Sequence, residues 1–256
     1  MSVIDVAPTV SSVSRAKQIG LVARWRWARA STQLGLLVIV EVALALTTVL
    51  GYGLLIGDPP PGAAQYLATG AATIMLVSVG LMLAPQMIIE ARQEGSLDWL
   101  RALPLSRVAI FFADTLMFTL LALPGVVLGL IAGRWRFDVS MSPQWWTVPV
   151  FVAVAIISTG IGQLIALVLP PMIGEAITQL LVFVVMVFSP VSFPASRLPA
   201  WLDTVHSVLP IESMANLIRA AVISDTFSAT ARDWIVVAIW LALSVTCSVA
   251  ALSRRR

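Results

Sequence analysis

The stretch Glu90–Arg107, EARQEGSLDWLRALPLSR, is the densest run of charge in a chain in which Asp, Glu, Lys and Arg make up only 11% of the residues. It joins two long apolar runs, at 64–89 and 108–132. Gly95 interrupts the helical pattern, and Pro104 ends it. A charged, Gly-broken segment between two apolar runs predicts a loop that holds a short helix at the face of a membrane.

The composition of the whole chain indicates a membrane protein. Of its 256 residues, 59% are hydrophobic, and the mean hydropathy is +0.95. A soluble globule needs far more charge on its surface. A spanning helix needs about 20 apolar residues. Six runs approach that length, at 33–57, 64–89, 108–132, 146–169, 177–193 and 234–252. The sequence therefore predicts an all-α polytopic membrane protein with one six-span domain over 33–252.

Basic residues flank these runs unevenly, which predicts the orientation of the chain. An even number of spans puts both termini on one side, and cytoplasmic flanks carry the excess of Lys and Arg. The side away from the termini has Arg134, Arg136, Arg197, Arg219 and Arg232. The terminal side has Arg15, Lys17, Arg24, Arg26, Arg29, Arg92, Arg101, Arg107, Arg254, Arg255 and Arg256. The segment 1–32, the loop at 90–107 and the tail 253–256 are therefore expected in the cytoplasm.

The net charge of +3 is concentrated in these flanks, so it indicates membrane orientation and no nucleic-acid partner.

Within 1–32, RAKQIGLVARWRWARAS (15–31) interleaves basic residues with Trp25, Trp27 and aliphatic residues. Such a segment suits an amphipathic helix that lies in the headgroup layer on membrane lipids. A basic flank that only sets topology is the alternative, and the sequence does not choose between them.

The residues of the opening stretch predict about two turns of helix after Gly95. Ser96 is expected to cap this helix by accepting hydrogen bonds from its free amides, and Asp98 complements the helix dipole. So short a helix is marginal alone and must dock on something, either its own bundle or a soluble partner. In the second case Leu97, Trp99 and Leu100 would form the docking face. Charged residues would set its orientation, namely Glu90, Arg92, Glu94, Asp98 and Arg101.

The pattern E-x-x-x-E-G-S-L-D-x-L followed by L-P-L-S-R, over 90–107, resembles the first cytoplasmic loop of type-2 ABC transporter permeases. These are the membrane subunits of bacterial drug, lipid and polysaccharide exporters. The resemblance implies that the loop carries a coupling helix, which sits on a nucleotide-binding subunit. It also implies localisation in the bacterial cytoplasmic membrane.

The stretch Ser189–Ile223, SPVSFPASRLPAWLDTVHSVLPIESMANLIRAAVI, is similar to the family's segment before the last span. The matching residues are Pro190, Phe193, Pro194, Leu198, Pro199, Trp201, Leu202, Pro210 and Arg219. Leu209 departs from the family pattern, which usually has Asn before the last of these prolines. Of these residues, Phe193, Pro194, Pro199, Trp201, Pro210 and Arg219 are expected to belong to an extracytoplasmic gate segment built from interfacial or re-entrant helices.

The residues of this stretch support two interpretations of their own. Leu198, Trp201, Leu202, Val205, Val208 and Leu209 form one apolar stripe at helical spacing, and we expect Asp203 and His206 elsewhere on the surface. Such Pro-bounded segments can re-enter the membrane and cap a pathway, or they can lie as a surface loop on the bilayer.

The resemblance also implies partners. The chain has no G-x-x-x-x-G-K-S/T loop to hold ATP phosphates, so ATP and Mg are expected on a separate ABC ATPase subunit and no cofactor on this chain. A six-span chain is expected to pair with a second copy or a paralogue. The expected substrate is an amphipathic drug-like or lipid-like molecule, because the spans offer few polar groups.

Other classes of function have less support. The sequence has a single cysteine, Cys247, which excludes a cysteine-cluster metal site. It has no H-E-x-x-H or G-x-S-x-G motif and only one histidine, which disfavours an enzyme. An ion- or proton-coupled secondary transporter would need an ionisable residue within the membrane, and Glu41 is the candidate. Its alternative role is an interhelical hydrogen bond with Gln163 or Gln179. Asp114 is expected near the cytoplasmic interface, in water or beside arginines there.

Overall fold

The computed structural model describes residues 13–253, in which six helical stretches are long and apolar enough to cross a membrane. The first twelve residues of the expected segment 1–32 and residues 254–256 of the expected tail lie outside the described part. The spanning stretches are α1 (Arg15–Ile56), the run of α2 (Pro61–Ser78), η1 (Val79–Leu83) and α3 (Ala84–Gln93), then α5 (Arg107–Phe137), α6 (Thr147–Val168), α7 (Pro171–Phe188) and α10 (Ala231–Ser253). The described chain is a helical bundle and a multi-pass membrane protein.

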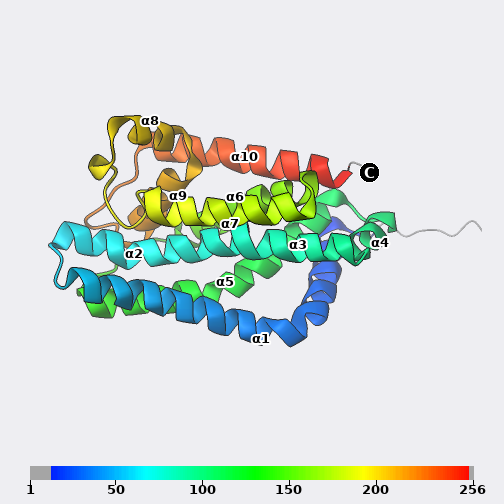
Figure 1. Cartoon of the computed structure of the whole chain (residues 1–256), viewed down its shortest axis with the longest axis horizontal. Coiled ribbons are helices and arrows are strands. Elements are labelled where there is room, and N and C mark those ends of the chain that lie inside the picture. The colour runs from blue at the N-terminus through cyan, green and yellow to red at the C-terminus, as the bar shows by residue number, and fades with distance from the viewer. Residues whose placement is uncertain (1–12, 254–256) are drawn as a thin grey trace, which may run out of the picture.

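The bundle has two ends of different construction (Figure 1). One, which we name the α4 end, holds the start of α1, the short helix α4 (Ser96–Ala102) and the end of α10. The other, the α8 end, holds the α1–α2 turn, the 3-10 turn η2 (Ala195–Arg197), α8 (Ala200–Val208) and α9 (Pro210–Val222). Both ends of the described chain thus lie at the α4 end, as an even number of crossings requires.

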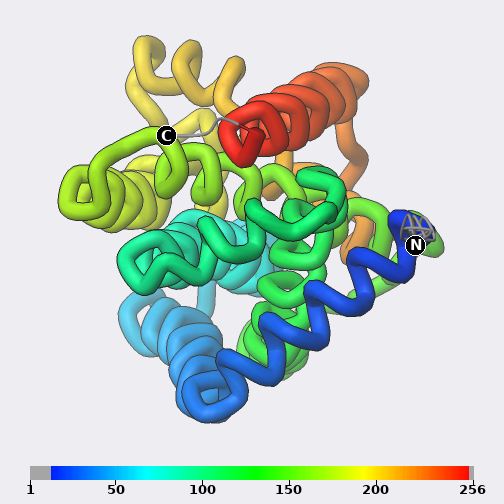
Figure 2. Tube along the Cα trace, turned by 90° about the vertical axis from the view of Figure 1, so that its right-hand side faces the viewer, coloured from blue at the N-terminus to red at the C-terminus, as the bar shows by residue number. Residues whose placement is uncertain are grey.

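Helix α1 is continuous but bent. Its first part crosses the α4 end of the bundle at a steep angle to the rest, which Figure 2 shows in dark blue in front of the other helices. Val22, Arg26 and Ala30 of this first part are buried, whereas Leu21 and Trp27 are exposed. One face therefore packs on the protein, and an apolar face points away from it.

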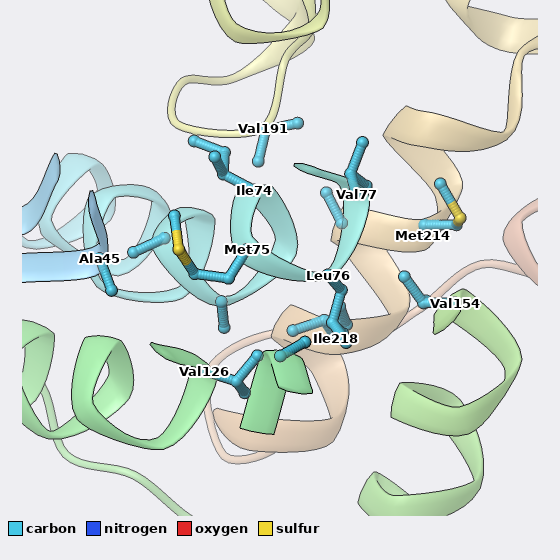
Figure 3. Close-up of a cluster of buried hydrophobic side chains, with 14 of the residues drawn as sticks. Ala45, Ile74, Met75, Leu76, Val77, Val126, Val154, Val191, Met214 and Ile218 are labelled. Atoms are coloured by element: carbon cyan, nitrogen blue, oxygen red, sulfur yellow. The ribbon is translucent and has the colours of Figure 1, made fainter. Parts of the chain in front are cut away.

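The α2–η1–α3 run is the central helix of the bundle. Most of α2 is buried, and its Ile74, Met75 and Leu76 pack among α5, α6 and α9 (Figure 3). The five π-helical residues of η1 widen the turn where the run meets α6. A Cβ added to Gly162 of α6 would lie 2.1 Å from the carbonyl oxygen of Gly80, so the contact requires glycine there.

The helix bounds differ from the expected spans mainly at the first, where α1 already begins at Arg15 and joins the expected interfacial segment to the span, and at the fifth. Helix α7 begins at Pro171 and ends at Phe188, so it starts and stops earlier than 177–193. Pro171 occupies the first helical position, where a missing N–H costs nothing, and this allows the helix to begin directly after the α6 turn. Pro190 then lies beyond the helix, in the segment that leads to η2.

Candidate functional site

The two-turn helix predicted after Gly95 is α4, at the end of the bundle. Gly95 is its N-cap, with a φ of 73°, a left-handed conformation that only glycine adopts without strain. The expected Ser96 cap is wrong, because Ser96 is already the first helical residue and its hydroxyl donates to the carbonyl of Ala91 at 3.2 Å. The turn is thus shaped by the backbone of Gly95.

The apolar docking face predicted for α4 needs correction. Leu97 and Leu100 are 1% and 2% exposed and pack with Ile88, Ile110 and Phe111 in the chain's own core. They hold α4 on the bundle because a short helix gains its stability from such packing. Trp99 alone of the three expected docking residues is exposed, at 52%.

The outward side of this region is acidic. Glu90, Glu94, Asp98 and Trp99 are all exposed, and we name these four residues the α4 face. Asp98 pairs with Arg101 at 3.3 Å, although its side chain stays 75% exposed. The face therefore exposes three carboxylates and one aromatic ring, and two of the carboxylates are paired within the chain, Glu94 with Arg29 and Asp98 with Arg101.

Two side-chain contacts tie the α4 face to the crossing part of α1. The rings of Trp25 and Trp99 lie 5.5 Å apart, and Arg29 forms an ion pair with Glu94. A hydrogen bond adds to them, in which the backbone N–H of Ser106 donates to Gln18 at 3.0 Å. The region around α4 is therefore in direct side-chain contact with the start of α1.

A buried ion pair anchors the same part of α1 to the bundle. Nε of Arg26 lies 2.8 Å from Oδ1 of Asp114, and both side chains are less than a tenth exposed. Gln163 of α6 donates to the other carboxylate oxygen at 3.5 Å. Of the two positions expected for Asp114, in water or beside arginines, the structure shows the second.

Arg92 is directed toward its own chain rather than outward. Its guanidinium donates to the carbonyls of Ala166 and of Leu169, the latter at 2.9 Å, where α6 ends. The expectation that Arg92 orients a partner is therefore not supported by its position. Instead it joins α3 to the α6–α7 junction.

The side chain of Glu41, in the spanning part of α1, is buried where α1 packs on α5. It is 3% exposed, and its backbone oxygen lies against Gly125 of α5. Neither expected partner is in place, since Gln163 bonds to Asp114 and Gln179 is exposed. Within the described residues Oε2 of Glu41 has no hydrogen-bond partner.

At the opposite end, α8 lies on the outside of the bundle. Of the expected apolar stripe, Trp201, Val205 and Val208 are exposed, whereas the other members are partly buried, namely Leu198, Leu202 and Leu209. The expectation of a surface His206 is wrong, because this side chain is only 3% exposed. Burial lowers the pKa of His206, against the opposing effects of Glu212 and Asp203, and this favours the neutral imidazole.

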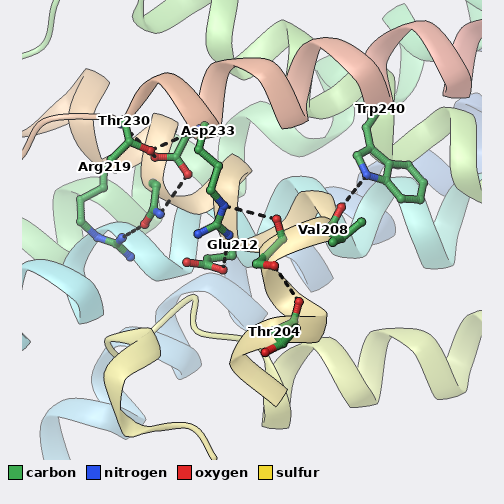
Figure 4. Close-up of polar contacts among 10 residues, drawn as sticks. Thr204, Val208, Glu212, Arg219, Thr230, Asp233 and Trp240 are labelled. Atoms are coloured by element: carbon green, nitrogen blue, oxygen red, sulfur yellow. Dashed lines mark hydrogen bonds and ion pairs between the residues drawn. The ribbon is translucent and has the colours of Figure 1, made fainter. Parts of the chain in front are cut away.

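Helix α9, by contrast, is mostly buried and carries a polar network (Figure 4). Arg219 is fully buried, and it donates to Asn216 at 2.9 Å and to the carbonyl of Val191 at 2.8 Å. Asn216 in turn donates to Asp233 at the start of α10, at 3.2 Å. The Arg219 guanidinium carbon also lies 3.7 Å from the centre of the Tyr66 ring.

This network was only partly predictable. Arg219 was expected in the gate segment, whereas Tyr66, Asn216 and Asp233 were missed because they come from three separate parts of the sequence. Burial lowers the pKa of Arg219 to about 10, opposed by Tyr66 and Asp233, so the guanidinium stays charged at neutral pH. It is a fixed cation between α2, α9 and the segment before η2.

The expected gate residues do not converge on one site. Pro199 and Pro210 begin α8 and α9, Trp201 faces outward, and Arg219 lies in the core. Phe193 and Pro194 line a hollow against the α1–α2 turn. The expected gate segment therefore contains the N-terminal ends of α8 and α9 and the buried Arg219, and a hollow lies at its edge.

In the described residues, six apolar helical stretches, a charged two-turn helix at the α4 end and short helices before the last stretch make up the architecture. A family model described as ABC-2 type transporter matches residues 17–223. The chain belongs to this family and is an ABC transporter permease subunit. A search of curated proteins finds no match.

Proposed function

We propose that the chain is the membrane subunit of an ATP-driven exporter, and that a separate ABC ATPase docks on the α4 face. The α4 face carries this proposal, because Asp98 and Trp99 are exposed on the bundle-packed helix α4, and Glu90 and Glu94 are exposed at the end of α3 that leads into it. Family membership supports an ATPase partner, which would bind ATP and Mg. The carboxylates suit a basic rim on that partner, and Trp99 suits a contact at the centre of the interface.

The contacts at the α4 end support a path for the mechanical stroke. A push on α4 reaches the crossing part of α1 through Trp25–Trp99 and Arg29–Glu94. It also reaches the α6–α7 junction through Arg92. We propose that closure of the ATPase subunits drives these helices in two paired permeases and opens the pathway outward.

The sidedness of the membrane belongs to the same proposal. The α4 end would be cytoplasmic, in the inner membrane of a bacterium, with the basic crossing part of α1 on the headgroups. Exposed Leu21 and Trp27 beside the basic residues of that part support this position. The substrate would be amphipathic and drug-like or lipid-like. An ion-coupled carrier that uses Glu41 has only the burial of Glu41 in its favour.

Charge reversal at the α4 face tests the proposal. We expect an ATP-binding subunit to co-purify with the unaltered chain from native membranes in mild detergent, and Asp98→Arg to reduce its yield roughly ten-fold or more, since like charges would meet at the interface. Asp98 is largely exposed, so the bundle should stay folded.

The matched control is Asp203→Arg, which reverses an exposed acid on α8 at the other end. It should leave the yield of the ATP-binding subunit unchanged. Equal yields from all three chains would remove the α4 face as the docking site. If no ATP-binding subunit co-purifies with the unaltered, monodisperse chain, the proposal that ATP drives transport would be contradicted.

A further inference from the structure

A hollow of about 260 Å³ opens at the α8 end, between the α1–α2 turn and the segment 192–197. Much of its wall is apolar, with Leu67 from α2 and Phe193 and Pro194 from the segment before α8. Tyr52 of α1 closes another side. Its size is near the lower limit of small-molecule pockets, so it suits part of a ligand, such as a headgroup and the start of one chain.

The wall of this hollow carries a positive charge. Arg197 is exposed and lines the hollow, and none of the residues around the hollow is acidic. The nearest acid in sequence on the α1–α2 turn, Asp58, pairs instead with Arg136 at 3.6 Å.

We propose that this hollow binds an anionic amphiphile with a phosphate headgroup. The phosphate would lie on the Arg197 guanidinium, which can donate two parallel hydrogen bonds to it. The first part of one hydrocarbon chain would pack on Leu67 and Phe193. This inference rests on the proposed function in one respect, namely that the bound amphiphile belongs to the class of molecules that the permease transports.

Native mass spectrometry of the purified permease, without any ATPase, tests the site. The probes are short-chain phosphatidylglycerol, which is anionic, and short-chain phosphatidylcholine of the same chain length. We expect Arg197→Gln to weaken phosphatidylglycerol binding roughly ten-fold and to leave phosphatidylcholine binding unchanged. Ala63→Phe, which fills the hollow, should weaken phosphatidylglycerol binding by a similar factor.

Each variant has a matched control. Arg134→Gln removes another exposed arginine at the same end, outside the hollow, and Gly62→Phe adds a ring one residue away, where the structure leaves open space. Both controls should bind like the unaltered chain. Equal loss in Arg134→Gln would mean general charge attraction, and unchanged binding in Arg197→Gln or Ala63→Phe would overturn the site. Because no ATPase is present, this outcome is independent of whether the α4 face docks one.

Discussion

Replacement of Asp114 by alanine is expected to lower the free energy of unfolding by about 3–5 kcal/mol, because it leaves the guanidinium of Arg26 buried without its counter-charge. Arg26 is 7% exposed and has Asp114 as its ion-pair partner at 2.8 Å. The loss is measured by tryptophan fluorescence during unfolding in mixed micelles with rising dodecyl sulfate. The crossing part of α1 would lose its anchor to α5.

Two further variants make this prediction specific to the buried charge. The double variant Arg26→Met, Asp114→Leu should recover most of the loss, because apolar side chains of similar volume often replace a buried pair without cost. Glu94→Ala breaks the neighbouring Arg29 pair, whose side chains are 47% and 45% exposed, and should cost about 1 kcal/mol or less. If Asp114→Ala is no more destabilised than Glu94→Ala, the buried pair is not an anchor.

Arg219→Leu is expected to cost about 3 kcal/mol of unfolding free energy, the second largest effect. The change removes charge-assisted hydrogen bonds to Asn216 and Val191 and the contact with the Tyr66 ring. Arg219→Lys should also be destabilised, because a lysine lacks the planar fork that reaches two acceptors at once. The same micelle titration measures both variants.

The control for this prediction is Arg134→Leu, which removes an exposed arginine at the same end and should change stability by less than about 0.5 kcal/mol. A measured stability for Arg219→Leu equal to that of Arg134→Leu would show that the network on α9 does not hold the α8 end together. Full stability of Arg219→Lys would show that charge alone suffices.

The features that the sequence predicted correctly rest on local rules. Long apolar runs predicted six spans, and Gly95 and Pro104 predicted the limits of α4 within two residues. Each of these inferences depends on residues that are neighbours in the chain. For Asp114 the sequence left open a place in water or beside arginines, and only the fold shows the pair with Arg26.

The errors arise where tertiary contacts decide. The apolar residues Leu97 and Leu100 indicate that α4 packs on another surface. Only the fold shows that this surface is the chain's own bundle. The burial of His206 and the hydrogen-bond partners of Glu41 were misjudged for a similar reason, since a helical wheel does not reveal which neighbour covers a side chain. The Arg219 network joins parts of the chain as distant as Tyr66 and Asp233, and no local pattern connects them.

Site-specific photo-crosslinking in native membranes tests the central claim most directly. A benzoylphenylalanine at position 99, in the exposed α4 face, is compared with one at position 145, an exposed tryptophan at the opposite end. We predict that position 99 yields a crosslinked product containing an ATP-binding subunit and that position 145 yields none. Absence of this product from position 99, or equal amounts from both positions, would contradict docking of an ATPase on the α4 face.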